Sequence, residues 1–209
     1  MMDVTLRAGL ALAAYVLVLG LTFGVRAARQ RAQTGDSGLR GITGRPWSPE
    51  WLGGVFFVVA LVLFAVSPVV AMLGWMPVLA GAFWSSVWPV LLGWLLVVAG
   101  TGYVLWSQAA MGHSWRVGVD HGERTELVTS GPFAQVRNPV FSGIVAAATG
   151  FALLVPGWFA LAALLMLVAA IRLQVRHAEE PYLLATHGEA YRRYAASTGR
   201  FLPGVGCLR

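Results

Sequence analysis

The residues best suited to chemistry in this chain lie in one irregular stretch, SGPFAQVRNPVF, which begins at Ser130. Gly131-Pro132 and Asn138-Pro139 favour turn or extended backbone, because proline disfavours the helical conformation of the residue before it. Such backbone frees main-chain N–H and C=O groups, which a membrane tolerates only where they line a cavity or are buried in protein. Arg137 could hold an anionic group through its planar fork of donors, or could anchor at phospholipid headgroups. The stretch is therefore a candidate wall of a binding site.

A second group of polar residues follows the last apolar run. Helical spacing places Arg172, Arg176 and Glu179 or Glu180 on one face of a helix. One interpretation is an Arg176–Glu180 pair that helps the helix leave the bilayer and stabilises it by a few tenths of a kcal/mol. The other is that these groups bind a polar ligand, since ionisable residues near membrane depth are costly. The spacing alone leaves both interpretations open.

The composition indicates that these residues belong to an integral membrane protein. Of 209 residues, 57% are hydrophobic and 11% are charged, with a mean hydropathy of +0.69, whereas a soluble domain carries about 25% charged residues. The net charge of +6 comes from arginine, since the chain has no lysine. The positive-inside rule already predicts arginines beside membrane spans, so we expect no nucleic-acid partner.

Three apolar runs in the first half are long enough to cross a bilayer, whose core of about 30 Å needs about 20 helical residues. Arginines, glycines and prolines in the segment 26–50 predict a loop on the cytoplasmic side, while the uncharged connector after the second run is predicted to lie outside. Gly20 and Gly24 match a small-xxx-small packing pattern, although the match is weak in a chain with 25 glycines. The three runs are Val4–Val25, Trp51–Leu73 and Trp88–Ala110.

Two shorter runs of 16 residues follow, Val140–Val155 and Trp158–Leu173, separated by the turn signal Pro156-Gly157. Each would be about 24 Å long as a helix, so the 140–173 hairpin could cross a thinned bilayer or enter it only partly. In either case the chain returns to its starting side, which places both polar segments of the second half in the cytoplasm. The sequence thus predicts an all-α, polytopic bundle of about five transmembrane helices, with residues 1–110 and 111–209 as its two parts.

Motifs of soluble enzymes are missing from the sequence. It contains no GxGxxG after a predicted strand, no Walker loop, no HExxH and no GxSxG. His113, His121, His177 and His187 lack metal-ligand spacing, so we expect no metal site. The single cysteine, Cys207, excludes an intramolecular disulfide.

The order and spacing of residues 111–203 resemble the isoprenylcysteine carboxyl methyltransferase family of integral-membrane enzymes, which are related to the phospholipid methyltransferases. The family pattern is Gly-Pro-Tyr, Arg-His-Pro and Tyr, an apolar hairpin, then Arg, Glu-Glu-x-x-Leu, Gly-x-x-Tyr-x-x-Tyr and Arg-x-x-Pro. Asn138 replaces the usual histidine, and Phe133 and Phe141 replace tyrosines. The matching residues are Gly131, Pro132, Phe133, Arg137, Asn138, Pro139, Phe141, Arg172, Glu179, Glu180, Leu183, Gly188, Tyr191, Tyr194, Arg200, Phe201, Leu202 and Pro203.

The resemblance implies S-adenosylmethionine as cofactor, held in a cytoplasmic pocket between the 130–141 loop and the helix that carries Glu179 and Glu180. It implies a lipid-like or hydrophobic small substrate, with a carboxyl or amine acceptor, that enters between helices from the bilayer. Either glutamate could stabilise the positively charged cofactor, and an arginine could hold a carboxylate of cofactor or acceptor. Catalytic roles fall to Arg137, Arg172 and Glu180, and cofactor binding to Gly131, Pro132, Phe133, Val136, Arg137, Asn138, Pro139, Phe141, Glu179, Glu180, Leu183 and Tyr191.

Two other functions remain open on the sequence alone. Membrane sterol and steroid reductases that use NADPH resemble the C-terminal region, and a non-catalytic membrane protein could keep the same fold. For either methyltransferase or reductase, we expect a multi-pass protein with its N-terminus outside and its C-terminus in the cytoplasm. The lysine-free composition, rich in Ala, Arg, Gly and Val, favours a prokaryotic plasma membrane.

Overall fold

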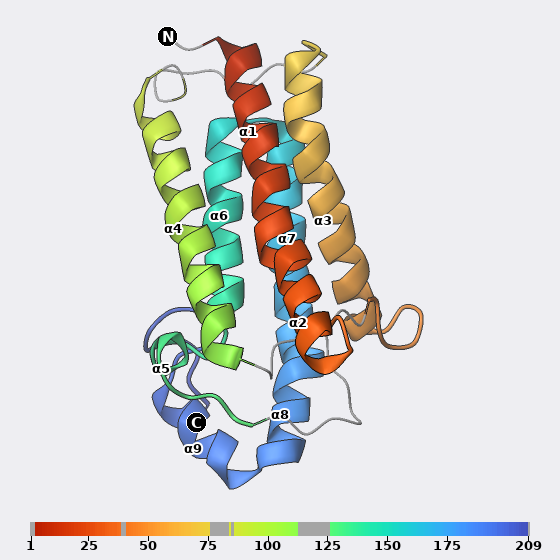
Figure 1. Ribbon diagram of the computed structural model, residues 1–209, viewed down its shortest axis with the longest axis vertical. Helices are drawn as coiled ribbons and strands as arrows, with labels where there is room; N and C mark the ends of the chain where they lie inside the picture. The colour runs from red at the N-terminus through yellow and green to blue at the C-terminus, as the bar shows by residue number, and fades with distance from the viewer. Residues whose placement is uncertain (1–2, 39–40, 76–83, 85, 113–125, 209) are drawn as a thin grey trace.

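The computed structural model describes residues 3–38, 41–75, 84, 86–112 and 126–208 (Figure 1). Within these residues the regular structure is helical throughout, which confirms the predicted all-α, polytopic bundle. The helices run along the long axis of the molecule, and the N-terminus and C-terminus lie at opposite ends. Their bounds are α1 Val4–Leu19, the π-helical turn η1 Gly20–Val25, α2 Arg26–Thr34, α3 Pro49–Met72, α4 Trp88–Met111, α5 Pro132–Gln135, α6 Pro139–Leu154, α7 Trp158–Gln174, the π-helical turn η3 Val175–Glu179, α8 Glu180–His187 and α9 Glu189–Ser197.

Four helical segments are long and apolar enough to cross a membrane, and α6 is a shorter apolar helix of 16 residues. The turn predicted at Pro156-Gly157 separates α6 from α7 as expected. The five apolar helices therefore begin and end within a few residues of the predicted runs, apart from two extensions described below. The four long segments are Val4–Gln33, Pro49–Met72, Trp88–Met111 and Trp158–His187.

The first extension corrects the predicted loop at 26–50, because the helix does not stop at Val25. It passes through η1 into α2 and ends only at Gly35, whose φ of 80° is a left-handed cap. The residues of α2 are mostly alanine, arginine and glutamine, which favour helix whatever their polarity. Charge therefore marks where the chain leaves the apolar layer, not where the helix ends.

The second extension concerns the run Trp158–Leu173, which continues through η3 and α8 as one helical segment of 30 residues. A π-helical turn contains more residues per turn than an α-helix, so it rotates the side chains that follow it. The α-helical spacing that aligned Arg176 with Glu180 in the sequence is broken within this turn. The partners of Glu180 are consequently different from those that the spacing predicted.

The closest helix contact joins α4 to α6 through glycines spaced seven residues apart on both helices. A Cβ at Gly100 would lie 2.6 Å from the backbone nitrogen of Ala147, and one at Gly150 would lie 2.5 Å from the carbonyl oxygen of Gly93. Backbones that approach this closely exclude any side chain at the contact. Gly20 and Gly24, by contrast, have open space around the position of a Cβ, so the small-xxx-small match is not a packing contact.

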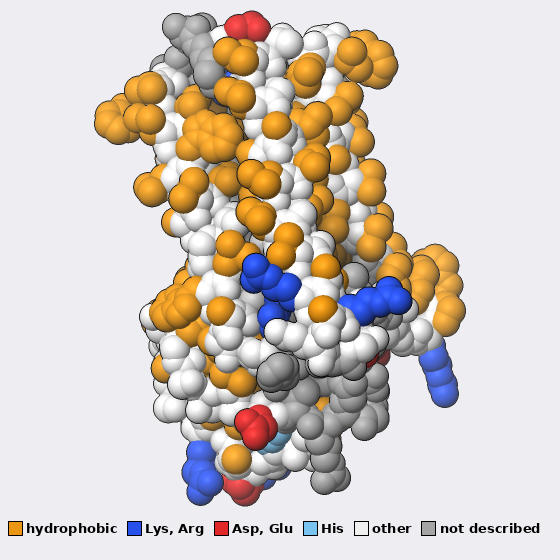
Figure 2. All heavy atoms as spheres, in the orientation of Figure 1, with side chains coloured by type: hydrophobic (Ala, Val, Ile, Leu, Met, Phe, Trp, Pro, Cys, Tyr) orange, Lys and Arg blue, Asp and Glu red, His pale blue; other side chains and the backbone are white. Residues whose placement is uncertain are grey.

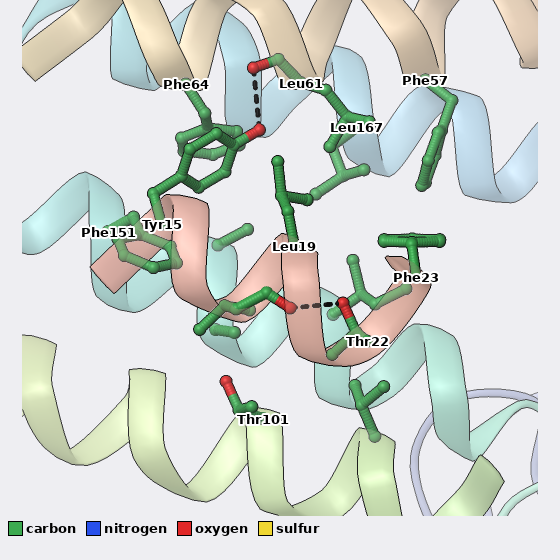
Figure 3. Close-up of a pocket in the computed structure, with 15 residues that line it drawn as sticks. Tyr15, Leu19, Thr22, Phe23, Phe57, Leu61, Phe64, Thr101, Phe151 and Leu167 are labelled. Atoms are coloured by element: carbon green, nitrogen blue, oxygen red, sulfur yellow. Dashed lines mark hydrogen bonds between the residues drawn. The ribbon is translucent and has the colours of Figure 1, made fainter. Parts of the chain in front are cut away.

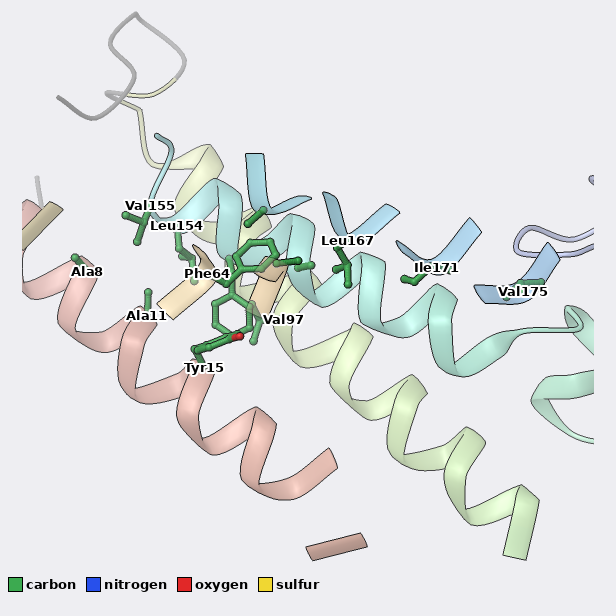
Figure 4. Close-up of a cluster of buried hydrophobic side chains, with 14 residues drawn as sticks. Ala8, Ala11, Tyr15, Phe64, Val97, Leu154, Val155, Leu167, Ile171 and Val175 are labelled. Carbon is green, nitrogen blue, oxygen red and sulfur yellow. The ribbon is translucent and has the colours of Figure 1, made fainter. Parts of the chain in front are cut away.

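The core lies where α1, α3, α6 and α7 meet, and its centre is aromatic (Figure 4). Tyr15 packs edge-on against Phe151, with ring centroids 5.4 Å apart, and lies 6.2 Å from the ring of Phe64. The Tyr15 hydroxyl donates a hydrogen bond of 2.8 Å to the carbonyl of Leu61 on α3. The aromatic cluster thus joins α1 to two other helices inside the apolar layer.

The wide turn η1 is also joined to α4 by a side chain. Gln108 donates from Nε2 to the carbonyl oxygen of Thr22 over 2.8 Å, and Arg26 donates to the carbonyl oxygen of Gly112. Hydrophobic side chains cover most of the visible face, while arginines gather toward the end that carries α8 and α9 (Figure 2). This surface agrees with a protein embedded in a membrane.

We expect Gly100→Ala to destabilise the protein by about 1–3 kcal/mol, because the added methyl group must push α4 away from α6. Gly102→Ala, two residues along on the exposed face of α4, has open space at the Cβ position and is the matched control. Thermal unfolding in detergent, followed by circular dichroism, measures both. Equal melting temperatures for the two variants would contradict the close α4–α6 contact.

Candidate functional site

The end of the bundle opposite the N-terminus, which we call the polar end, consists of the loop 130–138, α8, α9 and the tail 198–208 (Figure 1). Gly131 has a φ of 59° and lets the chain turn into the short helix α5, which starts with Pro132. Val136 is extended, and Pro139 then begins α6. Gly131-Pro132 and Asn138-Pro139 therefore produce the turn and extended backbone that the sequence predicted.

The backbone groups freed by this loop bind the protein's own tail. The N–H groups of Arg137 and Asn138 donate to the carbonyls of Gly199 and Arg200 over 2.8 and 3.1 Å, and Val136 forms a parallel bridge with Gly199. The Asn138 side chain adds a bond of 3.1 Å from Nδ2 to the Arg200 carbonyl. The predicted binding wall thus has one edge occupied by the tail.

Arg137, Glu180 and Arg200 form a buried group that we call the ion cluster. Arg137 Nη2 lies 2.9 Å from Glu180 Oε1, and the side chains are only 1% and 9% exposed. Arg200 donates from Nε to Oε1 over 2.9 Å and from Nη2 to Oε2 over 2.8 Å, in the bidentate geometry that is strongest for such pairs. The cluster carries one positive charge in excess, and Arg200, 32% exposed, is its accessible member.

The terminal nitrogens of Arg137 also hold the end of α9 and the tail. Nη1 donates to the carbonyl oxygens of Ala195 and Thr198, and Nη2 also donates to that of Gly206 over 3.0 Å. The carbonyls at a helix C-terminus carry partial negative charge and lack partners within the helix, so a guanidinium suits them. Arg137 therefore joins the loop, α8, α9 and the tail.

Two tyrosines of α9 close the inner side of the cluster. Burial, and then the negative charge of Glu180, raise the pKa of Tyr191 to about 12, while Arg137 acts in the opposite direction. Burial also raises the pKa of Tyr194, whose hydroxyl donates to the carbonyl oxygen of Phe133 over 2.6 Å. Both phenols are consequently neutral at physiological pH.

The structure brings most of the predicted site residues to the polar end, with Arg172 as the exception. Arg172 lies on the exposed surface of α7, apart from the ion cluster. Glu180 pairs with Arg137 and Arg200 rather than with the exposed Arg176, so the predicted Arg176–Glu180 pair is wrong. Glu179 is half-buried, and its charge acts on Tyr191.

The other predicted cofactor-binding residues divide into a buried and a more accessible set. Asn138 and the four other fully buried residues support the loop or α9, whereas the remaining ones retain some exposed surface. Phe141 and Leu183 pack against the hydrophobic clusters of the bundle and of α8. Pro132, Val136, Asn138, Pro139 and Tyr191 are buried, while Gly131, Phe133, Phe141 and Leu183 are not.

Two residues of the polar end were not assigned roles from the sequence. Arg200 lies within the Arg-x-x-Pro pattern, which indicated family resemblance without indicating a partner. Ser142 donates from Oγ to the carbonyl of Phe201 over 2.8 Å and so fixes the tail to α6. A serine in an apolar run gave no comparable signal.

No group of three or more His, Cys, Asp and Glu residues within the described part of the chain is arranged to hold a metal ion. His113 and His121, which the sequence analysis considered as metal ligands, lie outside the described residues.

Comparison with known families provides the deciding observation for this region. Residues 88–190 match the family described as Phospholipid methyltransferase. The matched part, 103 of the 209 residues, is similar to that family. The match starts at the first residue of α4 and ends in α9, so it includes Arg137 and Glu180 of the ion cluster, and the tail with Arg200 follows it.

The match to the phospholipid methyltransferase family supports a membrane methyltransferase. It also agrees with the resemblance that the sequence pattern indicated, since both rest on the same C-terminal helices. No curated protein matches the chain.

We expect Glu180→Gln to destabilise the protein by about 3–5 kcal/mol, because it leaves two guanidinium groups at the polar end without their carboxylate. Glu189→Gln is the matched control, since Glu189 pairs with Arg192 at the surface, where both side chains are about 70% exposed and such pairs contribute about 0–1 kcal/mol. Limited proteolysis should cut the tail of the Glu180 variant first. A tail equally protected in both variants would contradict the role of the cluster.

Stability at high pH should depend on Tyr191. The pKa of Tyr191 in the folded protein is about 12, above the value of about 10 in an unfolded chain. The contribution of this difference to the stability of the folded protein is therefore complete below pH ~10 and is lost as the pH rises towards 12. Alkaline titration of tyrosinate absorbance should lose the component near pH 12 in Tyr191→Phe, whereas Tyr194→Phe should retain it. Retention of that component in Tyr191→Phe would assign it to another residue.

Proposed function

We propose that this protein is an S-adenosylmethionine-dependent methyltransferase that acts on a lipid-like or hydrophobic small substrate. The observation that carries the proposal is the arrangement of the polar end. Residues 131–141 and 179–191, which are far apart in the sequence, come together through the Arg137–Glu180 pair, inside the region that matches the phospholipid methyltransferase family. These are also the segments that the sequence resemblance assigned to the cofactor.

The residue types at the polar end fit this cofactor, which supplies an electrophilic methyl group on a positively charged sulfur. Arg200 offers partly exposed positive charge for a carboxylate, since the ion cluster has more cations than anions. Glu179 is a carboxylate outside that cluster, and its negative charge suits an amino group or a sulfonium. Arg137 is saturated by protein acceptors at both terminal nitrogens, so we assign it to positioning the site.

The acceptor determines what else the site must do. A carboxylate acceptor is already nucleophilic and needs only to be oriented towards the methyl group. An amine acceptor must lose a proton, and the half-buried Glu179 is more accessible for that role than the buried Glu180. We propose that the acceptor enters from the bilayer, between the helices that support the polar end.

We also propose that the polar end lies in the cytoplasm, in a multi-pass protein whose N-terminus is outside. Exposed arginines of α2, α7, η3 and α9 share this end with the loop 130–138, in agreement with the positive-inside rule. Asp3, at the start of α1, lies at the opposite end. A prokaryotic plasma membrane remains the location that the composition favours.

Binding of S-adenosylhomocysteine to detergent-purified protein tests the proposal without knowledge of the acceptor. Isothermal titration should give saturable binding, and Glu179→Gln should weaken it at least tenfold in protein that still shows a cooperative thermal transition. Glu189→Gln on α9 is the matched control and should bind as the unsubstituted protein does. Transfer of a radioactive methyl group from S-adenosylmethionine into a chloroform extract of the source membranes then tests turnover.

Two other results would overturn the proposal. Binding of NADPH without binding of S-adenosylhomocysteine would indicate a reductase. Binding of neither ligand, by protein with a cooperative thermal transition, would indicate a non-catalytic member of the fold.

A further inference from the structure

A cavity of about 50 Å³ lies inside the bundle, away from the ion cluster, where α1 and η1 face α3, α4, α6 and α7 (Figure 3). Thr101 on α4 and Ala147 on α6 line it beside the packed Gly100–Ala147 contact, and ten residues, or about 15 Å of helix, separate Thr101 from Met111 at the end of α4. The cavity is therefore within the apolar layer.

The wall of the cavity is apolar except for three hydroxyl groups. Tyr15 donates to the carbonyl of Leu61 over 2.8 Å, and Thr22 donates to that of Val18 over 2.7 Å, so both donors are used. The hydroxyl of Thr101 is buried, has no hydrogen-bond partner, and points towards the cavity in Figure 3. A buried hydroxyl without a partner is destabilising, and a ligand that bonds to it removes that cost.

We propose that this cavity binds a short aliphatic group that carries one hydrogen-bonding atom, and that Thr101 is the partner of that atom. The volume is about a third of the ~150 Å³ apolar cavity that accommodates benzene, so only the few atoms at the end of a slim chain fit and a ring does not. A buried water needs about two to four polar partners, whereas this wall offers a single unused hydroxyl donor. Because it is separate from the ion cluster, the site does not depend on the proposed methyl transfer.

Such a group belongs to a small amphiphile, whereas the acyl chain of a membrane lipid has no polar atom at its end, and two photoreactive probes distinguish these occupants. One probe is octanol with an aliphatic diazirine, and the other is a phosphatidylcholine with a diazirine at the end of one acyl chain. Each is irradiated with the full-length protein in phosphatidylcholine vesicles, and labelled peptides are mapped by mass spectrometry. We expect the octanol probe to label the peptides that contain Tyr15 and Phe151, and unlabelled octanol to compete.

Four variants decide between recognition in the cavity and labelling from the surrounding lipid. Thr101→Val keeps the shape of the side chain and should reduce octanol labelling about fivefold, as expected for one lost hydrogen bond. Thr149→Val, on α6, should have no effect, because Thr149 donates to its own helix and does not line the cavity. Ala148→Leu should abolish labelling by filling the cavity, whereas Ala146→Leu, on the same helix and outside the lining, should not.

Three outcomes would overturn the proposal. Labelling that survives Ala148→Leu would place the probe outside the cavity, and equal labelling in Thr101→Val and Thr149→Val would exclude the hydroxyl as a partner. Cavity labelling by the lipid probe alone would indicate an acyl chain without a polar atom. If Ala148→Leu does not fold, the comparison of the two threonine variants still decides, since each removes only one hydroxyl group.

Discussion

The pair between Arg137 and Glu180 is the interaction on which the polar end depends. A buried charge is costly unless it is paired and hydrogen-bonded, and here one guanidinium satisfies a carboxylate and three backbone carbonyls from separate segments. The loop 130–138, α8, α9 and the tail cannot separate without leaving charge unpaired. A site built on irregular backbone is rigid for this reason, although it lies outside the close-packed bundle.

The same pair changes how the family pattern should be interpreted. Arg137 and Glu180 lie within residues 88–190, which match the phospholipid methyltransferase family, yet their side chains bind other parts of the chain. Arg200 and Glu179, at the edges of this arrangement, retain accessible surface. Pattern residues at this end therefore divide into buried ones that bind other parts of the chain and ones that retain accessible surface. Asn138 belongs to the first kind, since its amide donates to the carbonyl of Arg200.

The apolar bundle depends on a different constraint, which is that closely packed helices leave no space for larger side chains between them. The glycines of α4 and α6 bring two backbones into contact, while the wide turn η1 places Thr22 where Gln108 can satisfy its carbonyl. The cavity lies beside this turn, where α1 departs from regular helix and so cannot pack evenly on its neighbours. The position of the cavity is thus a consequence of local helix geometry.

The sequence by itself determined the membrane class, the five apolar helices, the turns at Gly131-Pro132 and Pro156-Gly157, and the family pattern, because hydropathy and proline act locally. Only the tertiary structure decided that Glu180 pairs with Arg137 and Arg200 instead of Arg176. A π-helical turn rotates the side chains that follow Arg176, and the two arginines that bind Glu180 are 43 and 20 residues away from it in the sequence. It also decided that Gly100 packs a helix while Gly20 does not. A residue's type limits what it can bind, but which groups lie within reach depends on how the helices pack.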